Sequence, residues 1–127
     1  MKDCSIHLTH RPGDFARVAE ALAHRGVNIK ALAALSIDGH AIVRILPDDI
    51  QGARSAFESA NIRFDEGEVH VVLLENRPGV LAAVANRLGD AGINLEALYT
   101  TGISADLVEV ALVCDNPKKA KTLLKEF

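Results

Sequence analysis

The sequence predicts an α+β fold in which one strand–helix–strand–strand–helix unit occurs twice. Three observations predict it: an internal repeat, apolar runs typical of strands beside apolar residues at helical spacing, and turn residues at matching places in both halves. The chain has 127 residues, of which 49% are apolar and 24% charged. This is a normal globular composition, and the length suits one ordinary domain or two very small ones.

The repeat is clearest around an Arg-Pro-Gly triplet. Arg11-Pro12-Gly13 returns 66 positions later as Arg77-Pro78-Gly79, and eleven of the 22 positions from 11 to 32 are identical at that offset. Chance would produce about one or two identities. A one-residue insertion near Ser104 extends the alignment to the end of the chain, so we expect one domain over residues 1–68 and a second over residues 69–127.

Each copy begins with a strand and a helix. Residues 6–8 alternate weakly, and residues 69–74 form the continuous apolar run of a buried strand. Proline then favours the first turn of a helix. Apolar residues at helical spacing follow it: Phe15, Val18, Ala19 and Leu22 in the first copy, and Leu81, Val84, Ala85 and Leu88 in the second. Gly26 and Gly92 mark the helix ends, because glycine tolerates left-handed φ.

The second half of each copy predicts a hairpin and a helix. Second strands open at residues 27–29 and 93–95, and third strands follow at 41–46 and 107–113. Asp38-Gly39 indicates a tight hairpin turn, and its counterpart at residues 102–106 is one residue longer. A second helix then begins after a cap, which is Asp48 or Asp49 in the first copy and Asn116, followed by Pro117, in the second.

A fourth strand is predicted in the first copy only, around residues 62–64. The order of elements is that of a ferredoxin-like βαββαβ unit, with two helices on one face of an antiparallel sheet. The second copy reaches Phe127 directly after its second helix, so we expect it to lack its last strand. The open sheet edge needs cover from the N-terminal segment, a swapped strand or another chain.

Charge and cysteine content narrow the classes of function. The net charge of -3 argues against a nucleic-acid partner or an anionic membrane surface, and no apolar run is long enough to span a membrane. The N-terminus does not resemble a signal peptide, and Cys4 and Cys114 form no CxxC motif. We therefore expect a cytoplasmic protein with reduced thiols, without a metal or other cofactor.

Two motifs in register resemble the signature of the ACT domain, a small-molecule-sensing module attached to many enzymes of amino-acid metabolism. Residues 75–81 (ENRPGVL) and 92–95 (GINL) resemble its first loop, the start of its first helix and the start of its second strand. Residues 9–15 (THRPGDF) and 26–29 (GVNI) match it less closely. The resemblance covers nearly the whole chain as a tandem pair.

This resemblance implies two ACT units side by side in a continuous sheet, with an effector, usually an amino acid, at their seam. It also implies that Asn94 meets a ligand on the loop at residues 10–14, and Asn28 one on the loop at 76–80. Free amides at a helix start attract a carboxylate on physical grounds as well. The candidate ligand-binding residues are His10, Gly13, Asp14, Phe15, Asn28, Asn76, Gly79, Val80, Leu81 and Asn94.

Simpler interpretations exist for several of these residues. Asn28 and Asn94 can bond their own turns, and His10 can be a solvated loop residue. The basic run of Lys118, Lys119, Lys121 and Lys125 is either a solvated helix face or a partner-docking face.

The sequence favours a stand-alone regulatory protein that is not an enzyme. It would bind an amino acid at the seam and signal by shifting the domain or subunit arrangement, as a homodimer and with an enzyme as a further partner. The alternative is a structural, partner-binding subunit of an amino-acid-metabolism enzyme with vestigial ligand sites. An acyl-phosphate hydrolase using Arg11 or Arg77 with an asparagine is disfavoured, because proline interrupts the backbone donors that a phosphate cradle needs.

Overall fold

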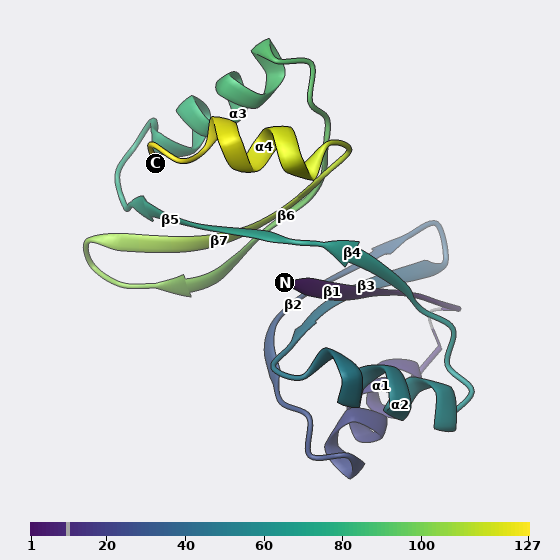
Figure 1. Cartoon of the computed structure of the whole chain (residues 1–127). Helices are drawn as coiled ribbons and strands as arrows, with labels where there is room; N and C mark the ends of the chain where they lie inside the picture. Colours follow the sequence, from purple (N-terminus) through teal and green to yellow (C-terminus); the bar gives the residue numbers. More distant parts are fainter. Residues whose placement is uncertain (10) are drawn as a thin grey trace. The chain divides into compact units, whose positions relative to one another are not determined.

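The computed structural model describes residues 1–9 and 11–127, which form two compact units. One unit spans Lys2–Gly67, and the other combines Met1 with Glu68–Phe127. In each unit, two helices cover one face of a sheet (Figure 1). The α+β class that the repeat predicts is confirmed.

The first unit has the complete βαββαβ order. Its elements are β1 (Lys2–Leu8), α1 (Asp14–His24), β2 (Ile29–Ile37), β3 (His40–Pro47), α2 (Ile50–Ser59) and β4 (Asp65–Glu68). The strands lie in the order β2-β3-β1-β4, and β3 is antiparallel to both of its neighbours. The predicted hairpin turn is present, since Asp38 and Gly39 have φ values of 50° and 77°.

The second unit repeats this order without a final strand. Its elements are β5 (His70–Glu75), α3 (Val80–Asp90), β6 (Leu95–Ile103), β7 (Leu107–Cys114) and α4 (Pro117–Leu123). The three strands lie in the order β5-β7-β6, with β7 antiparallel to both neighbours. Within the part of the chain that the structure describes, β5 is therefore an edge strand, where β1 of the first unit has β4 beside it.

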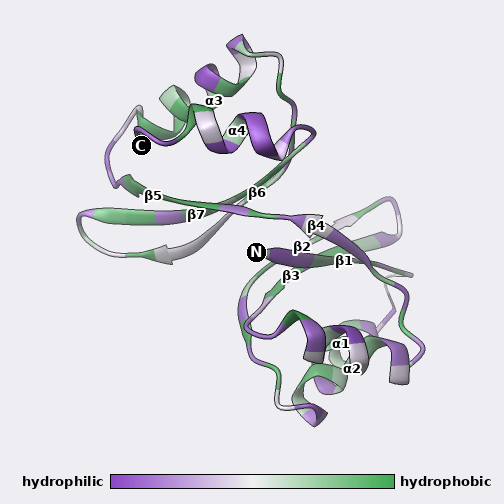
Figure 2. Cartoon of the chain, viewed as in Figure 1, coloured by the Kyte–Doolittle hydropathy of each residue, from purple (hydrophilic) through white to green (hydrophobic). Residues whose placement is uncertain are grey.

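Each unit has a core of its own, built from equivalent positions. Val18, Leu22 and Phe57 are fully buried between the helices and the sheet of the first unit. Their counterparts in the second unit are Val84, Leu88 and Leu124, at 1%, 1% and 2% exposure. Figure 2 shows hydrophobic colouring along β5 and β7 beneath the helices. Four residues of the predicted apolar stripes therefore face the core, namely Val18, Leu22, Val84 and Leu88, whereas Phe15, Leu81 and Ala85 are exposed.

The fourth strand begins later than the sequence predicts, at Asp65 rather than near residue 62. Ile62 donates its amide to the carbonyl of Phe57 at 2.8 Å, and Asn61 has a φ of 59°. Residue 62 therefore belongs to the turn that ends α2, and the strand starts only after Phe64. The predicted caps are present: Asp49 accepts from the amide of Gly52, and Asn116 from that of Lys119.

Candidate functional site

The first helix of the first unit begins beside a shallow hollow. Gly13 precedes α1 with a φ of 87°, which favours glycine, and no described side chain caps this helix start. The hollow has a volume of about 280 Å³. It is lined by Leu8, Arg11, Asp14, Phe15, Ala34, Leu35, Ser36, Ala41 and Val43.

Asp14 places a negative charge at this helix start. Its carboxylate accepts hydrogen bonds from the hydroxyl of Thr9 at 2.9 Å and from the amide of Arg11 at 3.3 Å. The hydrogen bond from Thr9, helped by Arg11 and by the charge of Arg17, holds the pKa of Asp14 below its ordinary value. The positive end of the α1 dipole thus already has a carboxylate beside it, and a second anion would be repelled there.

The equivalent helix of the second unit starts without an acidic residue in its first turn. Gly79 precedes α3 with a φ of 92°, and again no described side chain caps the helix. Val80 is 8% exposed and packs into the core, whereas Leu81 is 46% exposed. A hollow of about 370 Å³ lies at this helix start. It is lined by Leu73, Leu74, Glu75, Arg77, Gly79, Val80, Ala83, Leu107, Glu126 and Phe127.

This second hollow combines groups of both charges with apolar walls. The guanidinium of Arg77 donates to the carboxylate of Glu75, and Arg87 lies 3.2 Å from a carboxylate oxygen of Glu126. The first amides of α3 and Arg77 can attract a carboxylate, while Glu75 and Glu126 can attract an ammonium group. The arrangement is therefore suited chemically to a small zwitterion.

The two predicted asparagines lie at the other end of the first helix in each unit. Asn28 and Asn94 follow α1 and α3, and each of these 11-residue helices is about 16 Å long. Neither unit therefore brings its asparagine together with the start of its own helix. Asn94 donates its amide N–H to Asp115 at 3.1 Å and its side-chain Nδ2 to the same carboxylate at 3.3 Å.

Asp48 plays the same part in the first unit, because it accepts the amide N–H of Asn28 at 3.0 Å. Sequence reasoning missed this role for Asp48 and Asp115 and considered Asp48 only as a cap. A signal existed, since the repeat aligns the two aspartates. No such signal exists for Glu126, which reaches the α3 hollow from the segment after α4.

Asn76 braces the loop before α3. Its side-chain Nδ2 donates to the carbonyl of Ser104 at 3.0 Å, and its backbone amide donates to the carbonyl of Asp106 at 2.8 Å. The loop is thereby tied to the turn between β6 and β7. His10, the predicted counterpart of Asn76, lies outside the described residues.

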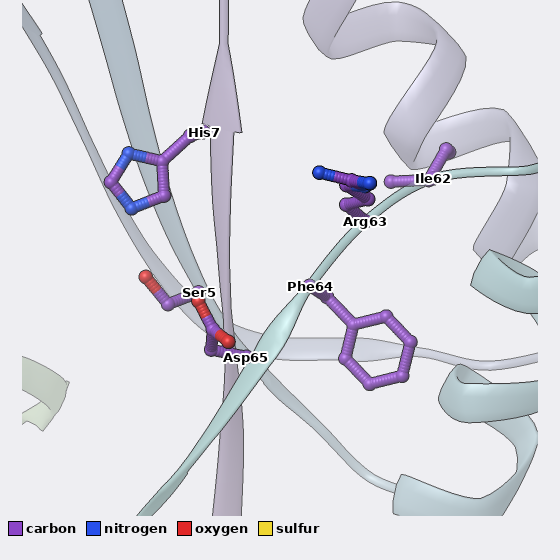
Figure 3. A pocket seen from close by; sticks show the side chains of 6 residues that line it. All are labelled: Ser5, His7, Ile62, Arg63, Phe64 and Asp65. Carbon is purple, nitrogen blue, oxygen red and sulfur yellow. The ribbon is translucent and has the colours of Figure 1, made fainter.

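A third hollow, of about 540 Å³, lies beside β1 in the first unit (Figure 3). It is lined by Ser5, His7, Ile62, Arg63, Phe64 and Asp65, none of which is a predicted site residue. Figure 3 shows Phe64 turned toward the helices and His7 on the other side of the hollow. Sequence reasoning identified no ligand chemistry at these positions.

Other chemistry finds little support in the described residues. Burial raises the pKa of the Cys4 thiol to about 12 and also raises the pKa of Cys114, so neither is a thiolate nucleophile at neutral pH. No group of three or more His, Cys, Asp or Glu residues in the described ranges could hold a metal ion. None of the helices described is both long and apolar enough to cross a membrane.

Comparisons with known proteins identify the fold. Residues 71–125 match the sequence profile of the ACT domain, and no curated protein matches the chain. Protein BT0572 from Bacteroides thetaiotaomicron is 27% identical with a TM-score of 0.88, covering 98% of this chain and 86% of that one.

Two further structures share the fold at lower identity. They are regulatory subunits of aspartate kinase from Thermus thermophilus, in a ligand-free form, and from Thermus flavus. Their identities are 20% and 19% and their TM-scores 0.69 and 0.67. Each comparison covers 98% of this chain and 87% of the other.

Proposed function

The chain is an ACT-domain protein, and from this premise we propose that it is a regulatory protein that binds an amino acid and catalyses no reaction. The observation that carries the proposal is the hollow at the start of α3. A free amino acid has a carboxylate, an ammonium group and a side chain, and the hollow offers a partner to each.

The two helix starts are unequal in this proposal. The start of α3 lacks an acid, whereas Asp14 stands at the start of α1. We therefore assign the effector carboxylate to the amides of Val80 and Leu81. At α1 the amide of Asp14 already donates to the carbonyl of Arg11 at 3.1 Å, so the amide of Phe15 carries a weaker second site.

The proposal keeps the effector at the seam between ACT units, where Asn28 or Asn94 of one unit completes the site on the loop of another. The effector acts by binding one arrangement of domains or subunits more tightly than the other. A ligand that binds both arrangements equally tightly does not change their populations. Domain limits of 1–68 and 69–127, a homodimer, an enzyme partner and a cytoplasmic location remain predictions.

Thermal unfolding against each of the twenty amino acids at millimolar concentration tests the proposal. A ligand at about 100 times its dissociation constant adds about 2.7 kcal/mol to the stability of the folded state. For a chain of this size the melting temperature then rises by about 10 °C. A flat response to all twenty would remove the amino-acid assignment.

Leu81→Asp separates effector binding from folding. Leu81 is exposed in the first turn of α3, where a negative charge interacts favourably with the helix dipole. Without effector, we expect the melting temperature of the variant to equal or exceed that of the parent chain. Its affinity for the effector should be lower. The neutral control, Leu81→Asn, keeps binding. If both variants bind equally well, the carboxylate lies elsewhere.

A second candidate function is a structural, partner-binding subunit with vestigial ligand sites. The side chain of Asn94 favours it, because its Nδ2 is already engaged by Asp115. In that case no amino acid shifts the melting temperature, yet the chain still associates with an enzyme of amino-acid metabolism. Co-purification of that enzyme without any effector present distinguishes this function.

A further inference from the structure

The hollow beside β1 is formed by two segments of the first unit that diverge. β1 continues to Leu8, whereas β4, its neighbour in the sheet, begins only at Asp65. The residues before β4 are held toward α2, because Ile62 donates its amide to Phe57 at 2.8 Å and Phe64 packs on the Phe57 ring. The core of the unit thus holds this wall of the hollow, of about 540 Å³, in place.

Four polar side chains line this hollow, two from each segment. Ser5 and His7 lie on the same face of β1, because side chains alternate along a strand. Figure 3 shows these two side chains and that of Asp65 pointing away from the helices. Arg63 is the fourth polar residue of the lining. The hollow therefore combines a guanidinium, an imidazole, a hydroxyl group and a carboxylate.

Arg63 differs from the other arginines of the first unit, which all have a hydrogen-bond acceptor. The arginines with an acceptor are Arg11, Arg17, Arg25, Arg44 and Arg54, which donate to Thr9, Ala60, Ser59, Asp3 and Glu66 respectively. Within the described residues, the side chain of Arg63 has no hydrogen bond or ion pair, and neither does that of His7 or Asp65. These groups are therefore available to a ligand.

Three donors and one acceptor define the chemistry of that ligand. The guanidinium of Arg63, the imidazole of His7 and the hydroxyl of Ser5 can each donate a hydrogen bond, and a phosphate group has three terminal oxygens to accept them. The planar fork of arginine also suits phosphate geometry. The carboxylate of Asp65 repels a bare anion but can accept a hydrogen bond from a hydroxyl group. The hollow is thus complementary to a phosphate group carried on a hydroxylated molecule.

We propose that this hollow binds a phosphate ester of a small polyol. The phosphate group lies on Arg63, His7 and Ser5, and a hydroxyl group of the polyol donates to Asp65. The hollow shares no lining residue with the hollows at the starts of α1 and α3. The proposal is therefore independent of the amino-acid site, and its test needs no amino acid.

The probe is glycerol 3-phosphate, titrated into the isotope-labelled full chain and followed by NMR. We expect the signals of Ser5, His7 and Arg63 to shift. Inorganic phosphate should bind more weakly, because it carries no polyol hydroxyl that can reach Asp65. Arg63→Gln should weaken binding of glycerol 3-phosphate about tenfold, because charge-assisted hydrogen bonds are lost. The matched control Arg25→Gln removes an exposed arginine outside the hollow and binds like the parent chain.

A third variant tests the role of the carboxylate. Asp65→Ala removes both the acceptor for the polyol hydroxyl and the repulsion of the anion. The affinities for glycerol 3-phosphate and inorganic phosphate should therefore become similar in this variant. Equal affinities in the parent chain would overturn the polyol assignment.

Several outcomes overturn the site itself. Absence of shifts at Ser5, His7 and Arg63 with millimolar glycerol 3-phosphate does so, as does equal weakening in Arg63→Gln and Arg25→Gln. Shifts confined to Val80 and Leu81 assign the phosphate to the start of α3 instead. Because the Arg63 side chain has no partner in the described chain, we expect Arg63→Gln to melt at the temperature of the parent chain, which separates lost binding from lost folding.

Discussion

Substitution of Asp115 separates the structural role of Asn94 from its proposed ligand role. The carboxylate of Asp115 accepts the backbone N–H of Asn94 at 3.1 Å and its side-chain Nδ2 at 3.3 Å. A charge-assisted hydrogen bond of this kind contributes about 1 kcal/mol at an exposed position. We expect Asp115→Ala to lower the melting temperature of the second unit by about 4 °C.

The same substitution frees the side-chain amide of Asn94. If that amide contacts the effector, Asp115→Ala binds the effector as well as or better than the parent chain does, whereas Asn94→Ala loses binding. Circular dichroism during heating, with and without the effector, measures both effects.

Two controls accompany this experiment. Asp48→Ala removes the equivalent bond to the amide of Asn28 and should destabilise the first unit similarly. Asp90→Ala removes a carboxylate at the C-terminal end of α3, where the helix dipole disfavours negative charge. This substitution should not destabilise the second unit. The reasoning is refuted if Asp115→Ala costs no more stability than Asp90→Ala, or if it abolishes effector binding.

Three further predictions concern pH and packing. Thr9→Val should raise the pKa of Asp14 toward its ordinary value in a carboxyl NMR titration, because the Thr9 hydrogen bond is the largest cause of the lowering. The stability from Asp14 is present above its unfolded pKa of about 3.9 and is lost as pH falls through the lower folded value. Lys121→Gln should raise the pKa of His70 only partly, since burial is the larger cause, as imidazole NMR titration can measure. Because the folded-state pKa of His70 is lowered, its contribution to folding stability is complete above its unfolded pKa of about 6.5. That contribution is lost as the pH falls from there through the folded-state pKa. Phe57→Ala should destabilise the first unit by about 3–5 kcal/mol in urea unfolding, because the ring is fully buried.

Much of the fold was predictable because its signals are local. The Arg-Pro-Gly triplet, the apolar spacing before Gly26 and the cap at Asn116 each act within a few residues along the chain. Because of the repeat, equivalent signals occur in both copies. Comparison of the two copies also predicted that the second unit lacks its last strand. The start of β4 was placed too early, because the hydrogen bond that draws residue 62 into the turn after α2 leaves no mark in the sequence.

The features of the candidate site likewise divide into those that the sequence determines and those that only the tertiary structure shows. The glycines before α1 and α3 and the position of each helix start follow from the sequence alone, since they depend on backbone conformation at one place. The partners of Asn94 and Asn76 lie 21 and 28 residues away, and Glu126 reaches the α3 hollow from beyond α4. Only the tertiary structure brings such residues together, because side-chain contacts across a sheet depend on strand register and helix placement. The sequence alone therefore determined the elements and the place where the first helix of each unit begins. The folded chain decided which charges surround those helix starts.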